Sequence, residues 1–93
     1  MNKKNTFQAI SEALDTNNLQ KAEDLLQTYC QTFTPDYMLY YMQGKLHMKR
    51  SEWGKAMSAF RRSEEIEPGG PAKQCRLMLE DIMAFYNKDM YNQ

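Results

Sequence analysis

The side chains in this sequence that are most able to take part in chemistry are one histidine, two cysteines and a short run of glutamates. His47 is the only histidine, and Cys30 and Cys75 have neither CxxC spacing nor a nearby histidine, a pattern typical of reduced, partly buried thiols. The glutamates within residues 64–67 indicate a solvated or partner-facing surface near a helix end. The sequence has no nucleophile elbow, glycine-rich phosphate loop or metal-ligand spacing. We therefore predict a protein that is not an enzyme and that binds no cofactor or metal.

Charge is balanced over the whole chain but uneven along it. Twelve Lys and Arg residues match twelve Asp and Glu residues, so no overall field draws the molecule to nucleic acid or to a membrane. The segment from Lys45 to Arg62 holds six cations and one anion, a local charge of +5. Three cations against five anions precede this basic middle, and three against six follow it. The basic middle suits an acidic peptide or head-to-tail contact between copies, or it is a solvated set of helix-surface charges.

Five amphipathic segments predict five helices and no strand. Apolar residues recur within each segment at helical spacing, and turn-favouring residues separate the segments. The expected helices cover Lys3–Asp15, Leu19–Gln31, Asp36–Met48, Glu52–Glu67 and Ala72–Asn87. A chain of 93 residues is large enough for one core and too small for two, so a single domain over 1–93 is expected.

Three local features mark the expected helix ends. Thr34 followed by Pro35 predicts an N-cap and a proline at the first position of the third helix. Ser51 is the expected cap of the fourth helix. The sequence PGGP at 68–71 is the clearest break in the chain, and its second proline is well placed to precede the fifth helix.

The fifth expected helix has an apolar side and a polar side. The apolar side holds Cys75, Met78, Leu79, Ile82, Met83, Phe85 and Tyr86. The polar side holds Lys73, Gln74, Arg76, Glu80 and Asp81. We predict that this helix caps the end of a helical stack by burying its apolar side, and that a short tail follows at 88–93.

The most specific signal is a spaced set of small and aromatic residues. Tyr40, Gly44, Ala56, Phe60 and Pro68 follow one another at intervals of 4, 12, 4 and 8 residues. The two small residues allow two helices to approach closely, the two aromatic rings fill the space on either side, and the proline ends the second helix. This pattern resembles the tetratricopeptide repeat, a 34-residue pair of antiparallel helices.

A second copy of the pattern strengthens the resemblance. Leu19, Lys21, Ala22 and Leu26 recur 34 positions later as Trp53, Lys55, Ala56 and Phe60. The resemblance covers about residues 3–70 and implies repeats at about 3–36 and 37–70, followed by a capping helix at about 71–87. It implies an all-α fold, a short right-handed α-solenoid of antiparallel helix pairs with about five helices. His47 stands where the family usually has a packed tyrosine, which implies a structural role for it.

In this family the first helix of each pair lines a concave groove. The residues of the third expected helix on that side are Met38, Tyr41, Met42, Lys45, Met48 and Lys49. Unbranched methionine side chains repack around different apolar partners, so such a groove is adaptable, although the same methionines would also serve as core filler. One subgroup of the family grips the C-terminal carboxylate of chaperones with Lys and Asn side chains. The position of that asparagine holds Lys45 here, and Ser11 in the first repeat, so the clamp is not matched.

The resemblance implies an adaptor or scaffold that binds a peptide or helix of another protein, acidic in character because of the basic middle. The alternative is a structural protein that associates with itself, for example as a homodimer, because fewer than three full repeats are marginal alone. Nucleic acid is not an expected partner, since acidic segments flank the basic middle. The N-terminus at Met1–Asn5 lacks the apolar run of a signal peptide and no window approaches a membrane span, so we expect a cytoplasmic protein without membrane contact.

Overall fold

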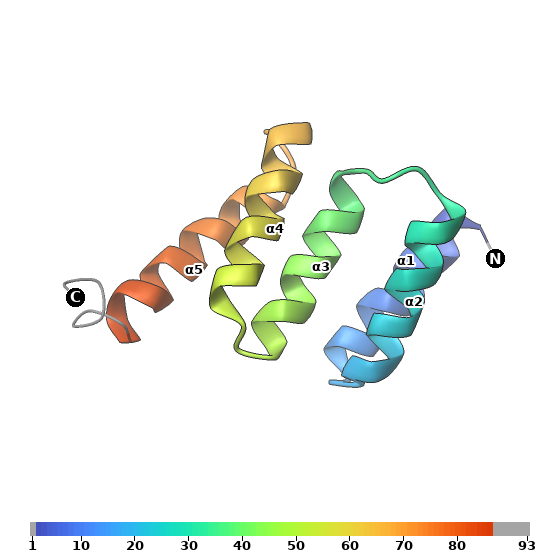
Figure 1. The fold of residues 1–93 in the computed structure, drawn as a ribbon, viewed down its shortest axis with the longest axis horizontal. Helices are drawn as coiled ribbons and strands as arrows, with labels where there is room; N and C mark the ends of the chain where they lie inside the picture. Colours follow the sequence, from blue (N-terminus) through green and yellow to red (C-terminus); the bar gives the residue numbers. More distant parts are fainter. Residues whose placement is uncertain (1, 87–93) are drawn as a thin grey trace.

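The computed structural model describes residues 2–86 of the 93, and this part of the chain forms five α-helices and no strand (Figure 1). The helices are α1 (Lys3–Asp15), α2 (Leu19–Thr32), α3 (Tyr37–Lys49), α4 (Trp53–Ile66) and α5 (Ala72–Tyr86). The all-α prediction is confirmed, and each described helix end lies within one residue of its predicted position. The tail predicted at 88–93 lies outside the described residues.

The helices follow one another in a row, each packed against its neighbours in the sequence. α2 packs against α1 and α3, and α4 packs against α3 and α5. Figure 1 shows α1 and α2 at one end of the row and α5 at the other. α3 and α4 begin and end 34 residues after α1 and α2, so the interval seen in the sequence is also the interval between the two helix pairs. None of the helices within residues 2–86 is long and apolar enough to cross a membrane.

The turns inside the two helix pairs share the same backbone hydrogen bonds. The Asn17 N–H donates to the Leu14 carbonyl at 3.1 Å, and the Ser51 N–H donates to the Met48 carbonyl at 3.0 Å. Asn17 and Ser51 are 34 residues apart, and both have left-handed backbones, with φ of 59° and 60°. A left-handed residue just after a helix is a common way to satisfy the last carbonyl groups. The repeat therefore extends to the backbone of the turns.

The predicted N-caps of the third and fourth helices are wrong. α3 is capped by Asp36, whose carboxylate accepts from the Leu39 N–H at 2.9 Å, so Thr34 and the proline after it lie outside the helix. Ser51 is part of the left-handed turn that closes α3, and this backbone leaves it one residue too early to cap α4. The N-cap position of α4 falls on Glu52, whose side chain makes no capping hydrogen bond.

Two apolar clusters make up the core. The first lies among α1, α2 and α3 and contains Ile10, Ala13, Leu14, Ala22, Leu26, Tyr29, Leu39, Met42 and Leu46. The second lies between α4 and α5 and contains Ala56, Met57, Phe60, Ala72 and Leu79. Tyr41 packs against both clusters. α3 is therefore the helix through which the two parts of the row contact each other.

The repeat-signature residues lie where close packing requires them. Ala56 and Phe60 are completely buried, and Gly44 is buried beside the Phe60 ring. Tyr40 is half-buried, and the Arg62 guanidinium lies over its ring, 5.0 Å from the centroid. Ala22 and Leu26 occupy the same places in the first cluster as Ala56 and Phe60 in the second. Pro68 is exposed, just beyond the end of α4.

α5 buries only part of the side predicted to be apolar and inward. Ala72 and Leu79 are buried in the second cluster. Met78 and Phe85 were predicted to face inward, but they are 50% and 79% exposed, and Leu77 is 45% exposed. A helix that packs against one neighbour covers about one face, so an apolar side as wide as this one cannot all be buried. The side chain of Tyr86 lies outside the described residues.

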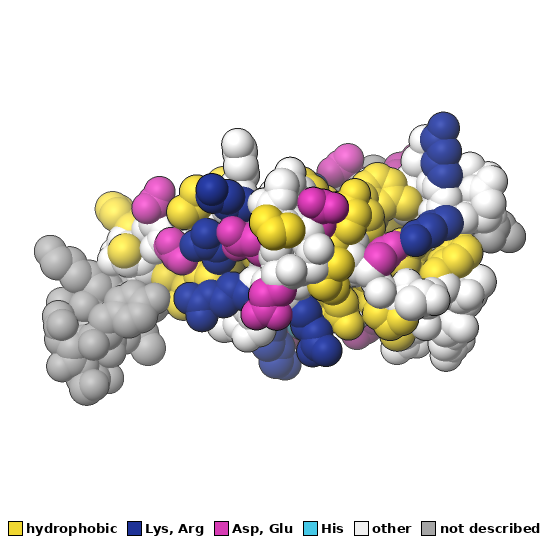
Figure 2. Space-filling view, turned by 90° about the horizontal axis from the view of Figure 1, so that it is seen from above, with side chains coloured by type: hydrophobic (Ala, Val, Ile, Leu, Met, Phe, Trp, Pro, Cys, Tyr) yellow, Lys and Arg dark blue, Asp and Glu magenta, His cyan; other side chains and the backbone are white. Residues whose placement is uncertain are grey.

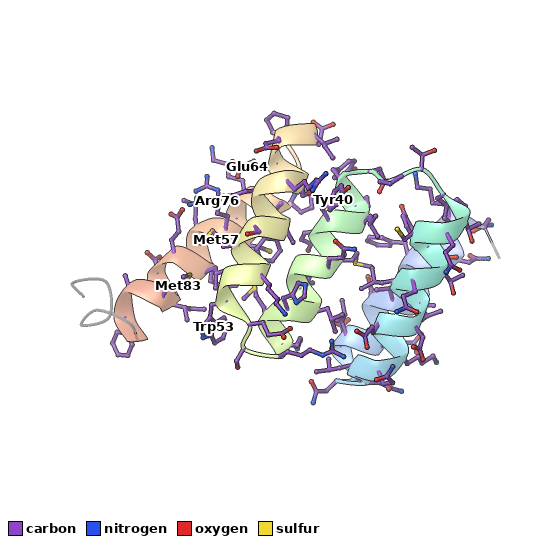
Figure 3. The ribbon with its side chains drawn as sticks, in the orientation of Figure 1. Tyr40, Trp53, Met57, Glu64, Arg76 and Met83 are labelled. Carbon is purple, nitrogen blue, oxygen red and sulfur yellow. The ribbon has the colours of Figure 1, made fainter. Side chains whose placement is uncertain are left out.

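An ion-pair network fixes α5 to α4. The guanidinium of Arg76 donates to both carboxylate oxygens of Glu64, at 2.6 and 3.1 Å, and to Glu80 at 2.9 Å. Figure 3 shows Arg76 and Glu64 extending toward each other from the two helices. Figure 2 shows acidic and basic side chains intermixed on this side of the molecule. The hydrogen bonds from Arg76 lower the pKa of Glu64. One member of the predicted acidic run is therefore a structural partner of α5.

Candidate groove for a peptide or helix

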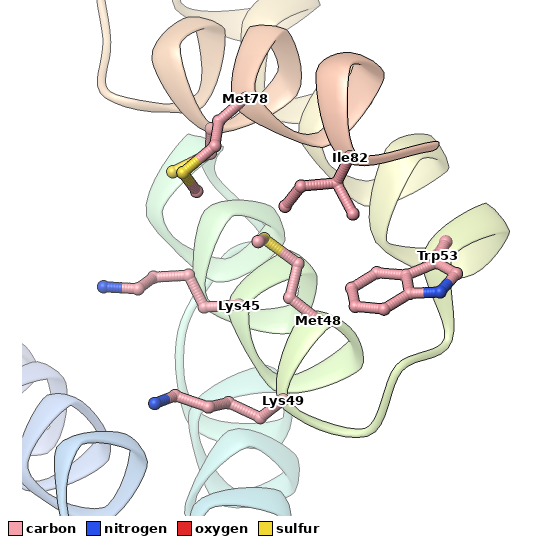
Figure 4. Close-up of a pocket in the computed structure, with 7 residues that line it drawn as sticks. Lys45, Met48, Lys49, Trp53, Met78 and Ile82 are labelled. Atoms are coloured by element: carbon pink, nitrogen blue, oxygen red, sulfur yellow. The ribbon is translucent and has the colours of Figure 1, made fainter. Parts of the chain in front are cut away.

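An apolar cleft of about 340 Å³ lies between α3 and α5, next to the start of α4. It is lined by Lys45, Met48 and Lys49 of α3, by Trp53 of α4, and by Cys75, Met78 and Ile82 of α5. Figure 4 shows Met48, Trp53 and Ile82 extending from three different helices toward one shared space. The two lysine side chains extend side by side at one edge of it. The cleft thus has an apolar bed, formed by Met48, Trp53, Cys75, Met78 and Ile82, and a cationic rim, formed by Lys45 and Lys49.

The helical register explains how α3 and α5 come to line the same space. On α3 the lining residues have the spacing i, i+3 and i+4, and on α5 they have the spacing i, i+3 and i+7, so each set occupies one helix face. Ile82 follows Met48 by 34 residues, and Cys75 follows Tyr41 by the same interval. α5 therefore continues the repeat register, but Met48 and Ile82 are the one pair at this interval in which both residues line the cleft.

Positive charge at the cleft is not neutralised by the protein itself. Elsewhere in the basic middle, Arg50 pairs with Glu23 at 3.3 Å and Lys55 pairs with Glu52 at 3.7 Å. Within residues 2–86, neither lysine of the cleft takes part in an ion pair, and the same is true of Arg61 and Arg62 on α4. The ammonium group of Lys45 lies 5.3 Å from the centroid of the Tyr41 ring, a cation–π contact that orients the charge without cancelling it.

The bed of the cleft is electrically neutral. Burial raises the pKa of the Cys75 thiol, an effect that the charge of Lys45 and a hydrogen bond with Tyr41 only partly offset. The thiol therefore stays protonated at neutral pH and behaves as a small apolar surface. Cys30 was predicted to be partly buried, but it is exposed and does not line the cleft, and both cysteines are free.

The structure brings together half of the predicted groove residues. Lys45, Met48 and Lys49 line the cleft, whereas Met38 and Tyr41 are half-buried and are not among its lining residues. The prediction is wrong for Met42, which is 2% exposed and part of the first core cluster. Met42 shares its helix face with Leu39 and Leu46, the buried residues that α3 presents to α1 and α2. For Met42, the core-filler interpretation is the right one.

Sequence reasoning missed four lining residues, Trp53, Cys75, Met78 and Ile82. Two of the three on α5, Cys75 and Ile82, could have been found by extending the 34-residue interval past residue 70, because they follow the predicted groove residues Tyr41 and Met48 by 34 positions; Met78 corresponds to Gly44 and had no such signal. Treating the fifth helix only as a cap concealed that relationship. Trp53 had no comparable signal, because the turn at Ser51 decides where the start of α4 lies.

His47 lies outside the cleft and has a structural partner. Its Nδ1 lies 2.9 Å from Oε1 of Glu52, and the Glu52 backbone N–H donates to the His47 carbonyl at 2.8 Å. The side-chain contact with the histidine lowers the pKa of Glu52. Together these contacts join the end of α3 to the start of α4. Among the described residues, no three His, Cys, Asp or Glu side chains form a group that could hold a metal ion.

No protein-family model matches the sequence, and no curated protein matches it. Among solved structures, the chain is similar to the solution NMR structure of the Bacteroides fragilis protein BF1650, with 34% sequence identity and a TM-score of 0.81. The likeness covers 100% of this chain and 92% of that one. The chain belongs to the same family as BF1650. The relationship spans all the helices described above, including α3 and α5, which form the cleft.

Proposed function

We propose that this chain is a non-catalytic, tetratricopeptide-like interaction module that binds an amphipathic peptide or helix of another protein in the cleft between α3 and α5. One observation carries the proposal: an apolar cleft from three helices borders two lysines that have no anionic partner within residues 2–86. The 34-residue interval between helix pairs and the repeated left-handed turn support the tetratricopeptide likeness. The exposed thiol of Cys30 suits a reducing compartment, which supports a cytoplasmic location.

The composition of the bed favours an apolar anchor on the partner. Methionines at 48 and 78 supply flexible, polarisable side chains that adapt to aliphatic or aromatic groups, and Trp53 offers a large flat surface. A volume of about 340 Å³ is at the small end of the range of ~300–1,000 Å³ typical of ligand pockets, so the cleft suits one or two side chains of a longer segment. The rest of the segment would lie along α3 and α5.

The lysine rim favours an acidic residue beside that anchor. Lys45 and Lys49 are one helical turn apart, so carboxylates spaced by three or four residues on a bound helix would meet both. Charged groups at the rim of an interface act mainly on association rate and on the choice of partner. The preferred ligand is therefore a short segment with one or two apolar anchors and acidic residues on one flank.

Selection from a random peptide library tests this proposal. We expect the enriched peptides to combine an apolar anchor with acidic residues and to lose binding on the variant Met78→Glu, which places a negative charge in the cleft. The matched control is Ile66→Glu at the end of α4. Ile66 is exposed to a similar extent, 51% against 50% for Met78, but it does not line the cleft. Enriched peptides that bind both variants equally well, or no enrichment at all, would contradict the proposal.

A further inference from the structure

An exposed line of side chains on α5 has an apolar centre with opposite charges at its two ends, and the charge at one end, on Lys73, also helps to lower the pKa of Glu64 on α4. Leu77 is 45% exposed, and Lys73 and Asp81 are exposed one helical turn before it and one turn after it. Spacing of four residues places the three side chains along one line of the helix. Within residues 2–86, neither Lys73 nor Asp81 belongs to an ion pair, and no helix covers this face.

We propose that two copies of this chain associate through α5, with the two helices antiparallel about a two-fold axis at Leu77. Such an axis brings residues at equal distances before and after Leu77 to the same height along the helix pair. Lys73 then faces Asp81 of the partner subunit, and by symmetry Asp81 faces Lys73 of the partner subunit. The arrangement forms two ion pairs around one central leucine contact.

The charge pattern selects this orientation over the alternatives. In a parallel pairing, each lysine would meet the same lysine and each aspartate the same aspartate, so the charges would repel. A surface that is complementary to itself in only one orientation is what a two-fold symmetric interface requires.

The size of the face sets the expected strength. α5 has 15 residues, about 22 Å of helix at 1.5 Å per residue, and only part of its circumference is free. An interface between two such faces is at the small end of those found in specific complexes, so we expect a weak, concentration-dependent dimer. Cys75 and Ile82 point into the cleft from another side of the helix, so the dimer would hold two open clefts.

Charge reversal in the full chain tests the pairing. Sedimentation of the wild type at concentrations up to about 1 mM should show a monomer–dimer equilibrium that weakens with added salt. Lys73→Asp and Asp81→Lys should each weaken dimerisation about tenfold or more, because each places two like charges opposite each other. The double variant restores both pairs and should recover most of the affinity. Lys21→Asp, on exposed α2 surface, is the control and should change nothing.

Each remaining outcome overturns the proposal. A wild type that stays monomeric throughout the series has no such interface. A dimer that tolerates both single variants uses another surface, and a double variant as weak as the single ones shows that the two charges do not meet.

A disulfide test locates the axis independently. In a background of Cys30→Ser and Cys75→Ala, Leu77→Cys should form a covalent dimer on mild oxidation, because residue 77 faces itself across a two-fold axis. Lys21→Cys in the same background should remain monomeric. Equal cross-linking of the two variants would reflect random collision and would refute the placement of the axis. None of these measurements depends on whether the cleft binds a peptide.

Discussion

A β-carbon at Gly44 would lie 2.5 Å from the nearest atom of the Phe60 ring, closer than any relaxed contact. α3 and α4 therefore meet at a point where only glycine fits, against a ring that is completely buried. Replacing this glycine by alanine would normally favour a helix by up to about 1 kcal/mol. At this site the Phe60 ring would have to move within a packed core, so the alanine should destabilise the protein instead of stabilising it.

We predict that Gly44→Ala lowers the free energy of unfolding by about 1–3 kcal/mol, as overpacking of a core does. Gly54 is the matched control, because it is also helical but has no atom within 4 Å of its would-be β-carbon. Gly54→Ala should stabilise the protein by about 0.5–1 kcal/mol. Urea denaturation measures both changes, and a shift of the same sign for both variants would mean that the close contact does not exist.

Asp36 predicts a loss of stability in acid. Burial by itself would raise its pKa, but hydrogen bonds from Lys3, from the Leu39 N–H and from the Tyr29 hydroxyl outweigh burial and hold the pKa below the ordinary value of 3.8. A carboxylate with a lowered folded-state pKa stabilises the fold above its ordinary pKa, and this contribution is lost as pH falls through the folded value. Unfolding midpoints should therefore drop below about pH 4.

Substitution of Asp36 by alanine isolates that contribution. The variant loses the N-cap of α3 and leaves the Tyr29 hydroxyl without its acceptor, so its stability at neutral pH should fall by about 1–3 kcal/mol. The part of the acid transition that Asp36 causes should disappear. Glu65→Ala, at an exposed site on α4, is the control. A variant with unchanged stability at neutral pH would show that Asp36 is not the cap.

Tyr29 should contribute to a loss of stability at alkaline pH. Burial raises the pKa of this phenol well above its ordinary value of 10.0, and the hydrogen bond to Asp36 raises it further. Ionisation is thus harder in the folded state, so the contribution is present below pH 10 and is lost as pH rises. Tyr29→Phe should remain stable to a higher pH than the wild type, relative to its own stability at neutral pH. Thermal unfolding followed across pH 9 to 12 measures this difference, as ~pH 10 is where free phenols ionise.

Loss of the Arg76 network should loosen α5 alone. In Arg76→Gln the hydrogen bonds to Glu64 and Glu80 are lost, while Ala72 and Leu79 still pack on α4. Amide hydrogen exchange should become faster in α5 and stay unchanged in α1 and α2, because terminal elements open independently in such arrays. Lys55→Gln, which removes a single exposed ion pair, is the control. Uniform acceleration in every helix would contradict this local role.

The cleft lysines predict how a selected peptide responds to salt. Reversing Lys45 and Lys49 to glutamate should weaken peptide binding about tenfold or more and reduce its dependence on salt. Reversing Arg61 and Arg62 changes the net charge equally but lies outside the cleft, and should have a smaller effect. Equal losses from the two pairs would show that a diffuse basic surface attracts the peptide.

Much of the fold could be predicted from the sequence because its signals are local and repeated. The interval from Ala22 to Ala56, together with the glycine at 44, predicts both helix pairs. The cap of α3 was misplaced because Asp36 competes with Thr34, and only the geometry of the turn decides between them. Half of the predicted groove residues line the cleft, because helical spacing shows which residues share a face but not which face a neighbouring helix covers. Met42 is the clearest example.

Packing between sequence neighbours has a consequence for folding and for binding. Most of the packing joins consecutive helices, and the longer-range packing includes that of α1 on α3, so the fold has a low contact order and should form quickly. The same arrangement lets α5 detach while α1, α2 and α3 remain assembled. The cleft exists only when α5 is packed beside α3, so it should form last during folding and be lost first during unfolding. A ligand bound in the cleft would therefore stabilise the docking of α5, at the end of the row that otherwise unfolds most easily.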